Sequence, residues 1–274
     1  GQSAGKMRAD GLEPTVVKDP LMIGSTTIRI LPCRTGSLSD IDSAIVIQYP
    51  DSAGRVHCVV NTNDVVFEDP LRRRLKAMAG EVDILLCGFT GAGPYPQTYF
   101  GLADPAIMVE AEKKKQAFFA RYQALVAVIE ARVNIPFAGK YVLGGKLAPL
   151  NAYRGVADPV EVLAIDPRAV VLADEGGEID TVTLRGSAGG TARYPAADLD
   201  RRTNDLRSCK MDYERLMFAD EVGQLPLKRL LVAAARNATS KSECEEDYFF
   251  CFALPDGVVA IINAKRNTPR SVQF

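Results

Sequence analysis

Two stretches between Val56 and Phe100 predict both the fold and the functional site of this chain. Val56–Asp64 reads VHCVVNTND, and Val82–Phe100 reads VDILLCGFTGAGPYPQTYF. Each begins with a short apolar run that is typical of a buried strand, and each continues into a polar or glycine-rich segment. In sheets covered by helices, ligands bind beyond the carboxyl ends of the strands. The sequence therefore predicts a ligand site where these two strands end.

The segments around this pair predict further strands and helices. An amphipathic helix is expected from Asp69 to Ala79, where Asp69-Pro70 starts it and Gly80 ends it. A long helix is expected from Asp104-Pro105 to about Val133. Strands are expected at Val16–Ile23, Thr26–Leu31, Ala44–Tyr49, Ile135–Ala138 and Tyr141–Leu143. This order of strands and helices predicts an α/β region.

The pattern changes beyond Asn151. Segments resembling a short antiparallel pair are followed by an amphipathic helix and a hairpin turned by Pro255-Asp256-Gly257. The expected segments are Val160–Ile165, Ala169–Leu172, Pro226–Asn237, Tyr248–Leu254 and Val258–Asn263. We therefore expect an α/β region at residues 1–155 and an α+β region at residues 156–274.

Composition excludes several partners and places the chain among ordinary globular proteins. The 274 residues are 47% hydrophobic and carry a net charge of −1. Because there is no long basic stripe, we expect neither nucleic acid nor a membrane as partner. No apolar run approaches the roughly 18–20 residues of a membrane span. Six cysteines without C-x-x-C spacing favour a reduced, cytoplasmic protein. The sequence leaves open whether the protein forms a homo-oligomer.

The first residues bear on what the sequence represents. The chain begins with Gly1-Gln2-Ser3 and has no initiating Met. This favours an excerpt of a longer protein over a chain left by tag removal.

The residues that end the first strand are the sharpest candidates for a site. Asn61, Asn63 and Asp64 could coordinate a metal ion or orient a water molecule, because a carboxylate and two amides supply suitable oxygens. The alternative is an Asx-rich turn whose side chains bond their own backbone. Both interpretations stay open from the residue types alone.

The glycine-rich segment after the second strand is the next candidate. Gly91, Gly93, Tyr95 and Tyr99 could form a cradle for an anion, since glycine allows close approach of backbone N–H groups. The spacing matches neither a Walker A motif nor a dinucleotide-binding fingerprint. The alternative is a rigid loop shaped by its two prolines.

A basic patch and a single histidine complete the candidates. Lys140, Lys146 and Arg154 could bind a phosphate or a carboxylate, or could be surface charge around two tight turns. The run Lys113–Lys115 is expected to be a solvated helix face. His57 is the only histidine, and one histidine in a strand is more often packed or exposed than catalytic. No catalytic residue is assigned.

From about Thr26 to Arg154 the sequence resembles the C-terminal half of a metallo-β-lactamase-fold protein. The resemblance lies in the strand that ends in N-x-N-D, the segment DILLCGFTGAGPYP, the long helix and the later PFAGKYVLGG. It is most similar to the branch related to CMP-N-acetylneuraminate hydroxylases. The implied fold is half of an αββα sandwich, and the implied role of Asp64 is that of a metal-bridging ligand.

The same resemblance shows what this chain lacks. The family's H-x-H-x-D-H cluster has no match here, and the loop where a further histidine ligand is often found offers Asp40 and Asp42 instead. One expectation is a metal-dependent hydrolase or hydroxylase-like oxidoreductase that uses Zn or Fe on a small-molecule substrate, with the missing N-terminal half supplied elsewhere. The other is a degenerate, non-catalytic binding or assembly module that uses the same cleft without a metal.

Overall fold

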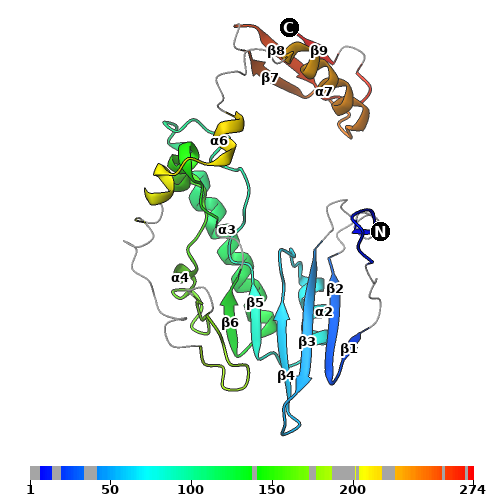
Figure 1. The fold of residues 1–274 in the computed structure, drawn as a ribbon, viewed down its shortest axis with the longest axis vertical. Helices are drawn as coiled ribbons and strands as arrows, with labels where there is room; N and C mark the ends of the chain where they lie inside the picture. The colour runs from blue at the N-terminus through cyan, green and yellow to red at the C-terminus, as the bar shows by residue number, and fades with distance from the viewer. Residues whose placement is uncertain are drawn as a thin grey trace. The chain divides into compact units, whose positions relative to one another are not determined.

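The chain forms two compact units, Gly1–Lys210 and Met211–Phe274. The ribbon of the computed structural model is shown in Figure 1. The structure describes residues 7–13, 20–33, 42–137, 141–172, 177–186, 201, 204–217, 226–254, 257–268 and 271–274.

The first unit contains a six-stranded mixed sheet in the order β1-β2-β3-β4-β5-β6 (Figure 1). The strands are β1 (Leu21–Ile23), β2 (Thr26–Pro32), β3 (Ser43–Pro50), β4 (Val56–Asn61), β5 (Ile84–Cys87) and β6 (Val133–Pro136). The pairs from β1 to β4 are antiparallel, whereas β4, β5 and β6 run parallel. This confirms the predicted α/β class.

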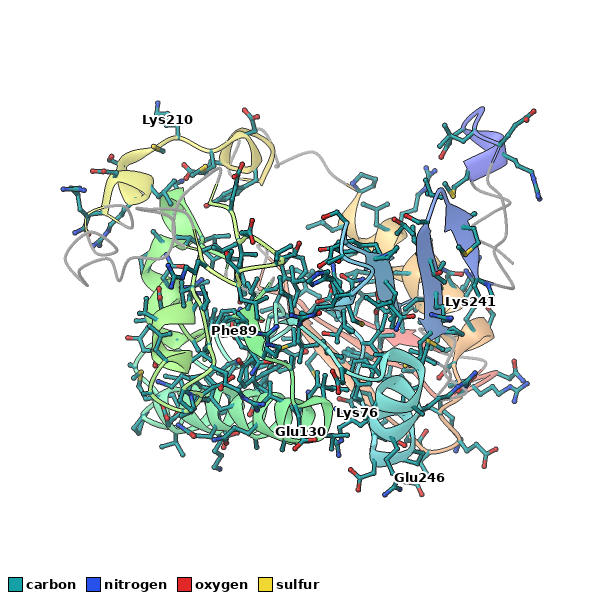
Figure 2. All side chains as sticks on the ribbon, turned by 90° about the horizontal axis from the view of Figure 1, so that it is seen from below. Lys76, Phe89, Glu130, Lys210, Lys241 and Glu246 are labelled. Atoms are coloured by element: carbon teal, nitrogen blue, oxygen red, sulfur yellow. The ribbon has the colours of Figure 1, made fainter. Side chains whose placement is uncertain are left out.

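Two helices make the crossovers that the parallel strands require. Helix α2 (Asp69–Ala79) connects β4 to β5, and α3 (Ala106–Ile129) connects β5 to β6. Their ends are joined, because Lys76 Nζ in α2 donates to the carbonyl oxygen of Ile129 at 2.6 Å and lies 3.8 Å from Glu130 Oε2 (Figure 2). The two predicted helices are confirmed.

One face of the sheet packs against these helices. Leu85 on β5 and Val60 on β4 share a buried cluster with Tyr122 on α3. Cys58 belongs to the same cluster, where burial raises the pKa of its thiol to about 11. Burial also raises the pKa of Cys87. Both thiols behave as small core side chains, as the sequence predicts.

On the opposite face, the described residues cover β4, β5 and β6 and reach β3 at Tyr49, whose hydroxyl donates to Thr181. Ile84, Val133 and Ile135 are buried there beneath partly buried residues of the chain after β6, namely Val170, Leu172, Ile179 and Leu184. The register places Ile30 opposite Ile45, Ile45 opposite Asn61, Asn61 opposite Leu86 and Leu86 opposite Ile135, so these residues share that face. Ile30 and Ile45 are 41% and 37% exposed, so the face stays open near β2 and β3.

The expected strand at Tyr141–Leu143 is wrong. This segment is irregular and is followed by the 3-10 helix η1 (Gly145–Tyr153). The side chain of Asn151 accepts from the Leu143 N–H at 2.9 Å and donates to its carbonyl oxygen at 2.8 Å. An amide side chain therefore bonds the backbone groups that a neighbouring strand would otherwise have paired.

The expected antiparallel pair after residue 159 is also wrong. Pro159–Val162 forms a short helix, α4, which starts with a capping box between Asp158 and Glu161. Ala169 forms a parallel bridge with Asn134 of β6 instead of pairing with the α4 segment.

The residues around α4 belong to the core of the first unit. Ala157 and Val162 are fully buried in the cluster beneath the helices, with Ile165 and Ala169 packed against it. The division expected between residues 155 and 156 stays a prediction, and the sequence boundary between the two compact units lies between Lys210 and Met211.

The second unit is α+β, as expected. It contains α6 (Asp212–Met217), α7 (Leu227–Lys241) and an antiparallel sheet of β7 (Phe249–Ala253), β8 (Val259–Asn263) and β9 (Val272–Gln273). The predicted helix and hairpin are confirmed. Across the residues that the structure describes, no helix combines the length and apolarity that crossing a membrane requires.

Candidate functional site

The loop after β4 begins with a tight polar turn. Asn61 Oδ1 accepts from the Asn63 N–H at 2.9 Å, which is an Asx turn, and Asn63 adopts a left-handed φ of 47°. The Thr62 N–H donates to the carbonyl oxygen of Leu86 at 3.0 Å and fixes the turn to the adjacent β5. Asn61 therefore shapes the turn, and Asp64 follows it with an exposed carboxylate.

The loop after β5 approaches this turn and helix α3. An added Cβ at Gly88 would lie 3.7 Å from the carbonyl oxygen of Asn63. An added Cβ at Gly91 would lie 2.2 Å from the ring of Phe118, so the aromatic ring occupies the space that a side chain would need. A side chain at position 91 would therefore require the Phe118 ring to move.

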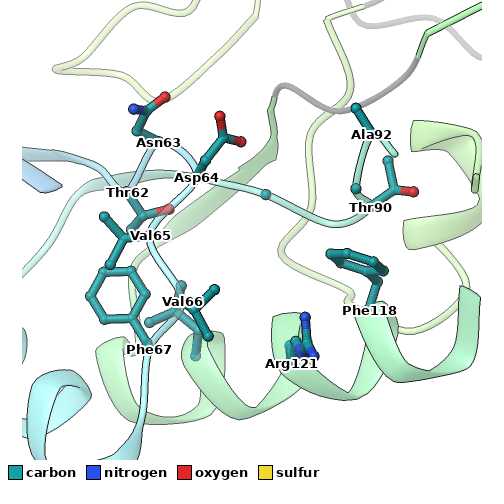
Figure 3. Close-up of a pocket in the computed structure, with 13 residues that line it drawn as sticks. Thr62, Asn63, Asp64, Val65, Val66, Phe67, Thr90, Ala92, Phe118 and Arg121 are labelled. Carbon is teal, nitrogen blue, oxygen red and sulfur yellow. The ribbon is translucent and has the colours of Figure 1, made fainter. Parts of the chain in front are cut away.

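A cavity of about 310 Å³ lies between these two loops and α3 (Figure 3). Of the predicted site residues, Asn63, Asp64 and Gly91 line it. Among the described residues, the lining does not include Asn61, Gly93, Tyr95, Tyr99 or Lys146. The carboxyl ends of β4 and β5 thus meet at a cavity, although only part of the predicted set faces it.

The sequence did not single out three polar or aromatic residues of the cavity wall. Thr90, Phe118 and Arg121 line the cavity together with the predicted residues. The Arg121 guanidinium lies 5.1 Å from the centroid of the Phe118 ring, in a cation–π contact. The signal available in the sequence was the spacing of Phe118 and Arg121, which places them on neighbouring parts of one helix face.

The chemistry of the cavity is mixed. Asp64 provides a carboxylate and Arg121 a guanidinium, and the structure shows no ion pair to either within its described part. Thr90 is buried, and its hydroxyl has no hydrogen-bond partner in the part of the chain that the structure describes. Val65, Phe67 and Leu125 add apolar wall. This arrangement suits a small molecule with polar groups at its ends and an apolar middle.

A metal site was expected around Asp64, with Asp40 and Asp42 as weaker candidates. Asp42 lies just before β3, where its carbonyl oxygen accepts from the Cys33 N–H at 3.1 Å, and Asp40 lies outside the described residues. Within the described part of the chain, no group of three His, Cys, Asp or Glu residues is placed to hold a metal ion. The described residues therefore do not fit a metal site on their own.

His57 is packed at the other end of β4. It is fully buried, and its Nε2 lies 3.0 Å from Asp51 Oδ2. That hydrogen bond lowers the pKa of Asp51. The His57 ring also stacks on Tyr49, with centroids 5.4 Å apart. The histidine thus stabilises the turn between β3 and β4 and lies away from the cavity.

The remaining predicted residues lie along the chain beyond the cavity. The carbonyl oxygen of Gly93 accepts from Tyr141 Oη at 3.0 Å, and the Tyr95 hydroxyl donates to Glu110, which raises the pKa of Tyr95. Tyr99 is 68% exposed, and Lys146 is exposed on η1. Lys140 lies outside the described residues.

The comparisons with known proteins give weak likenesses only. No family model matches the chain, and no curated protein matches it. Among solved structures, a mutant of the β-hydroxylase CmlA matches with 17% identity and a TM-score of 0.35, over 58% of this chain and 31% of that one. The diiron β-hydroxylase CmlA from Streptomyces venezuelae matches with 14% identity and a TM-score of 0.30, over 53% and 28%. The chain thus spans less than a third of either protein's length, and scores this low carry no argument about activity.

Proposed function

We propose that this chain binds a small polar molecule in the cavity between the β4 loop, the β5 loop and α3. The observation that carries the proposal is the placement of Asp64 and Arg121 on the wall of one cavity of about 310 Å³ that also has an apolar wall. Both charged groups lack an ion pair in the described structure, so a ligand would gain their hydrogen bonds without displacing protein partners. The volume is at the lower end of the range for small-molecule sites.

The binding test uses spectra of the isotope-labelled full chain with a panel of small carboxylates, amines and amino acids. A ligand is expected to shift the amide signals of residues 62–67 and 88–92. Arg121→Gln is expected to weaken its binding about tenfold, because one charge-assisted hydrogen bond is lost. Arg74→Gln, on the exposed side of α2, is the matched control and leaves affinity unchanged. If no compound of the panel shifts these signals, the proposal is wrong.

A second candidate function is a metal-dependent, hydrolase-like or hydroxylase-like enzyme of the metallo-β-lactamase superfamily. The observation that favours it is the exposed Asp64 carboxylate at the carboxyl end of β4, together with the resemblance of this strand end to the superfamily. The other ligands would have to come from outside the described residues, for example from a missing N-terminal half. Such a metal would polarise the substrate and lower the pKa of a bound water.

Metal content tests whether this chain holds a metal site by itself. The purified chain is analysed for zinc and iron before and after incubation with each metal. The binding module and an enzyme whose other ligands lie on a missing half both predict no stoichiometric metal in either case. Near-stoichiometric metal that is lost in Asp64→Ala but kept in Asp69→Ala, an exposed carboxylate on α2, would instead support the enzyme. Metal that is kept in both variants would remove Asp64 from the site.

A further inference from the structure

Arg154 is a buried cation with an unused donor. It follows η1, is only 8% exposed, and its guanidinium lies 5.0 Å from the centroid of the Tyr141 ring. Its Nε donates to the carbonyl oxygen of Asn151 at 3.1 Å, whereas its Nη1 is buried and has no hydrogen-bond partner among the described residues. A buried guanidinium normally pairs with an acceptor, so this donor lacks the partner that its burial calls for.

Lys114 brings a second positive charge to the same place. Its Nζ donates to the carbonyl oxygen of Tyr95 at 2.8 Å and to that of Arg154 at 2.9 Å. Burial and the charge of Arg154 lower the pKa of Lys114, and burial lowers the pKa of Arg154. The Lys114 ammonium therefore bonds the backbone of Arg154, and the two positive charges are close enough to repel each other in a partly desolvated position.

The neighbouring lysines show that this pair is unusual. Lys113 lies 2.6 Å from Glu110 and Lys115 lies 3.0 Å from Glu161, whereas no carboxylate pairs with Lys114 or Arg154 within the described residues. The sequence grouped Lys113–Lys115 as one solvated face and Arg154 with Lys146. In the structure Lys146 is exposed on η1, whereas the Nζ of Lys114 bonds the carbonyl oxygen of Arg154.

We propose that Lys114 and Arg154 form a binding site for an oxyanion, the phosphate or carboxylate group of a ligand. An anion here would neutralise both charges and accept from the unused Arg154 Nη1 and from the third N–H of Lys114. The Tyr141 ring that supports the guanidinium is held by its hydroxyl, which donates to Gly93 at 3.0 Å and accepts from Gln97 Nε2 at 2.9 Å. Neither Lys114 nor Arg154 lines the cavity, so the proposed anion site is distinct from the proposed cavity site.

The test measures binding of inorganic phosphate and of acetate to the full chain by calorimetry, in chloride buffer at constant ionic strength. At least one of the two anions is expected to bind more tightly than chloride, and the tighter one identifies the group that the site takes. Arg154→Gln is expected to weaken that binding about tenfold or more, as is Lys114→Gln. Lys113→Gln, on the same helix and paired with Glu110, is expected to leave it unchanged.

Two results would overturn the proposal. One is that neither anion binds more tightly than chloride, or that Arg154→Gln binds as the unchanged protein does. The other is that Arg121→Gln removes the binding, which would place the anion in the cavity. Circular dichroism checks the folding of each variant. If Arg154→Gln does not fold, Lys114→Gln decides the question alone, because Lys114 is only partly buried.

Discussion

The two faces of the six-stranded sheet differ in how completely they are covered. On the helix side, Leu31, Val46 and Leu85 from three strands are all fully buried. On the other side, the chain after β6 covers Ile84 and its neighbours, while Ile30 and Ile45 are 41% and 37% exposed. Polar residues interrupt both faces, with Arg29, Gln48 and Asn134 on the helix side and His57 and Asn61 on the open side.

On the open face, β2 and β3 therefore carry apolar side chains that the described residues do not fully cover. A sheet with one solvated face usually alternates apolar with polar residues, whereas Ile28, Ile30, Ile45 and Ile47 all lie on the open side. A missing half or a second copy would cover such a face, and both remain predictions. Substitutions on the closed face are therefore expected to lower the free energy of unfolding more than substitutions on the open face.

The largest effect is expected in the closed face. Leu85→Ala removes a fully buried side chain beneath α3 and leaves a cavity, so it should lower the free energy of unfolding by about 2–5 kcal/mol. Denaturant unfolding followed by circular dichroism measures the loss. Leu102→Ala is the control, because Leu102 is 51% exposed and its truncation should change stability little. Equal losses in the two variants would mean that this face is not the closed core.

A smaller effect is expected from the polar contact that joins α3 to the segment after α4. Tyr122 Oη donates to Asp166 Oδ2 at 2.7 Å, and both side chains are buried. Tyr122→Phe keeps the ring but removes this donor, which should cost about 1–3 kcal/mol. The same unfolding measurement applies. Tyr99→Phe, at a 68% exposed position, is the control and should leave the free energy of unfolding unchanged. An unchanged free energy of unfolding in Tyr122→Phe would show that this hydrogen bond contributes nothing to stability.

The smallest effect is expected in the open face. Ile45→Ala should cost less than about 1 kcal/mol, because over a third of Ile45 is already in contact with solvent. The comparison with Leu85→Ala in the same experiment gives the contrast between the two faces. A loss as large as that of Leu85→Ala would mean that another layer covers Ile45 in solution, and the difference between the faces would then disappear.

Local signals predicted most of the first unit. Asp69-Pro70 and Gly80 fixed the bounds of α2, and the short apolar runs located β2 to β5 within a few residues. The failure at Val160–Ile165 has a local cause, because Asp158-Pro159 followed by Glu161 is a capping box and therefore a helix start that outweighs the β-branched residues. The irregular Tyr141–Leu143 could not be predicted in this way, because Asn151 bonds it from eight residues away.

The position of the candidate site was predicted better than the set of residues that line it. Asn63, Asp64 and Gly91 line the cavity because the ends of parallel strands meet at one edge of a sheet. Arg121 and Thr90 were missed, since their exposure to the cavity depends on how α3 packs. The burial of Arg154 beside Lys114 depends on contacts between residues 40 positions apart, which no local pattern encodes.

The cavity lies beyond the hydrogen-bonded part of β4 and β5, and this affects how the protein can change in evolution. The pairing of β4 and β5 ends at Asn61 and Leu86, and the cavity begins with Thr62 and Gly88. Most residues that would determine which ligand the proposed site binds therefore lie outside the paired segments of the strands. Loops of this kind tolerate substitution better than the strands that carry them. Ligand preference can thus diverge among descendants of this chain while the sheet and its closed face stay the same.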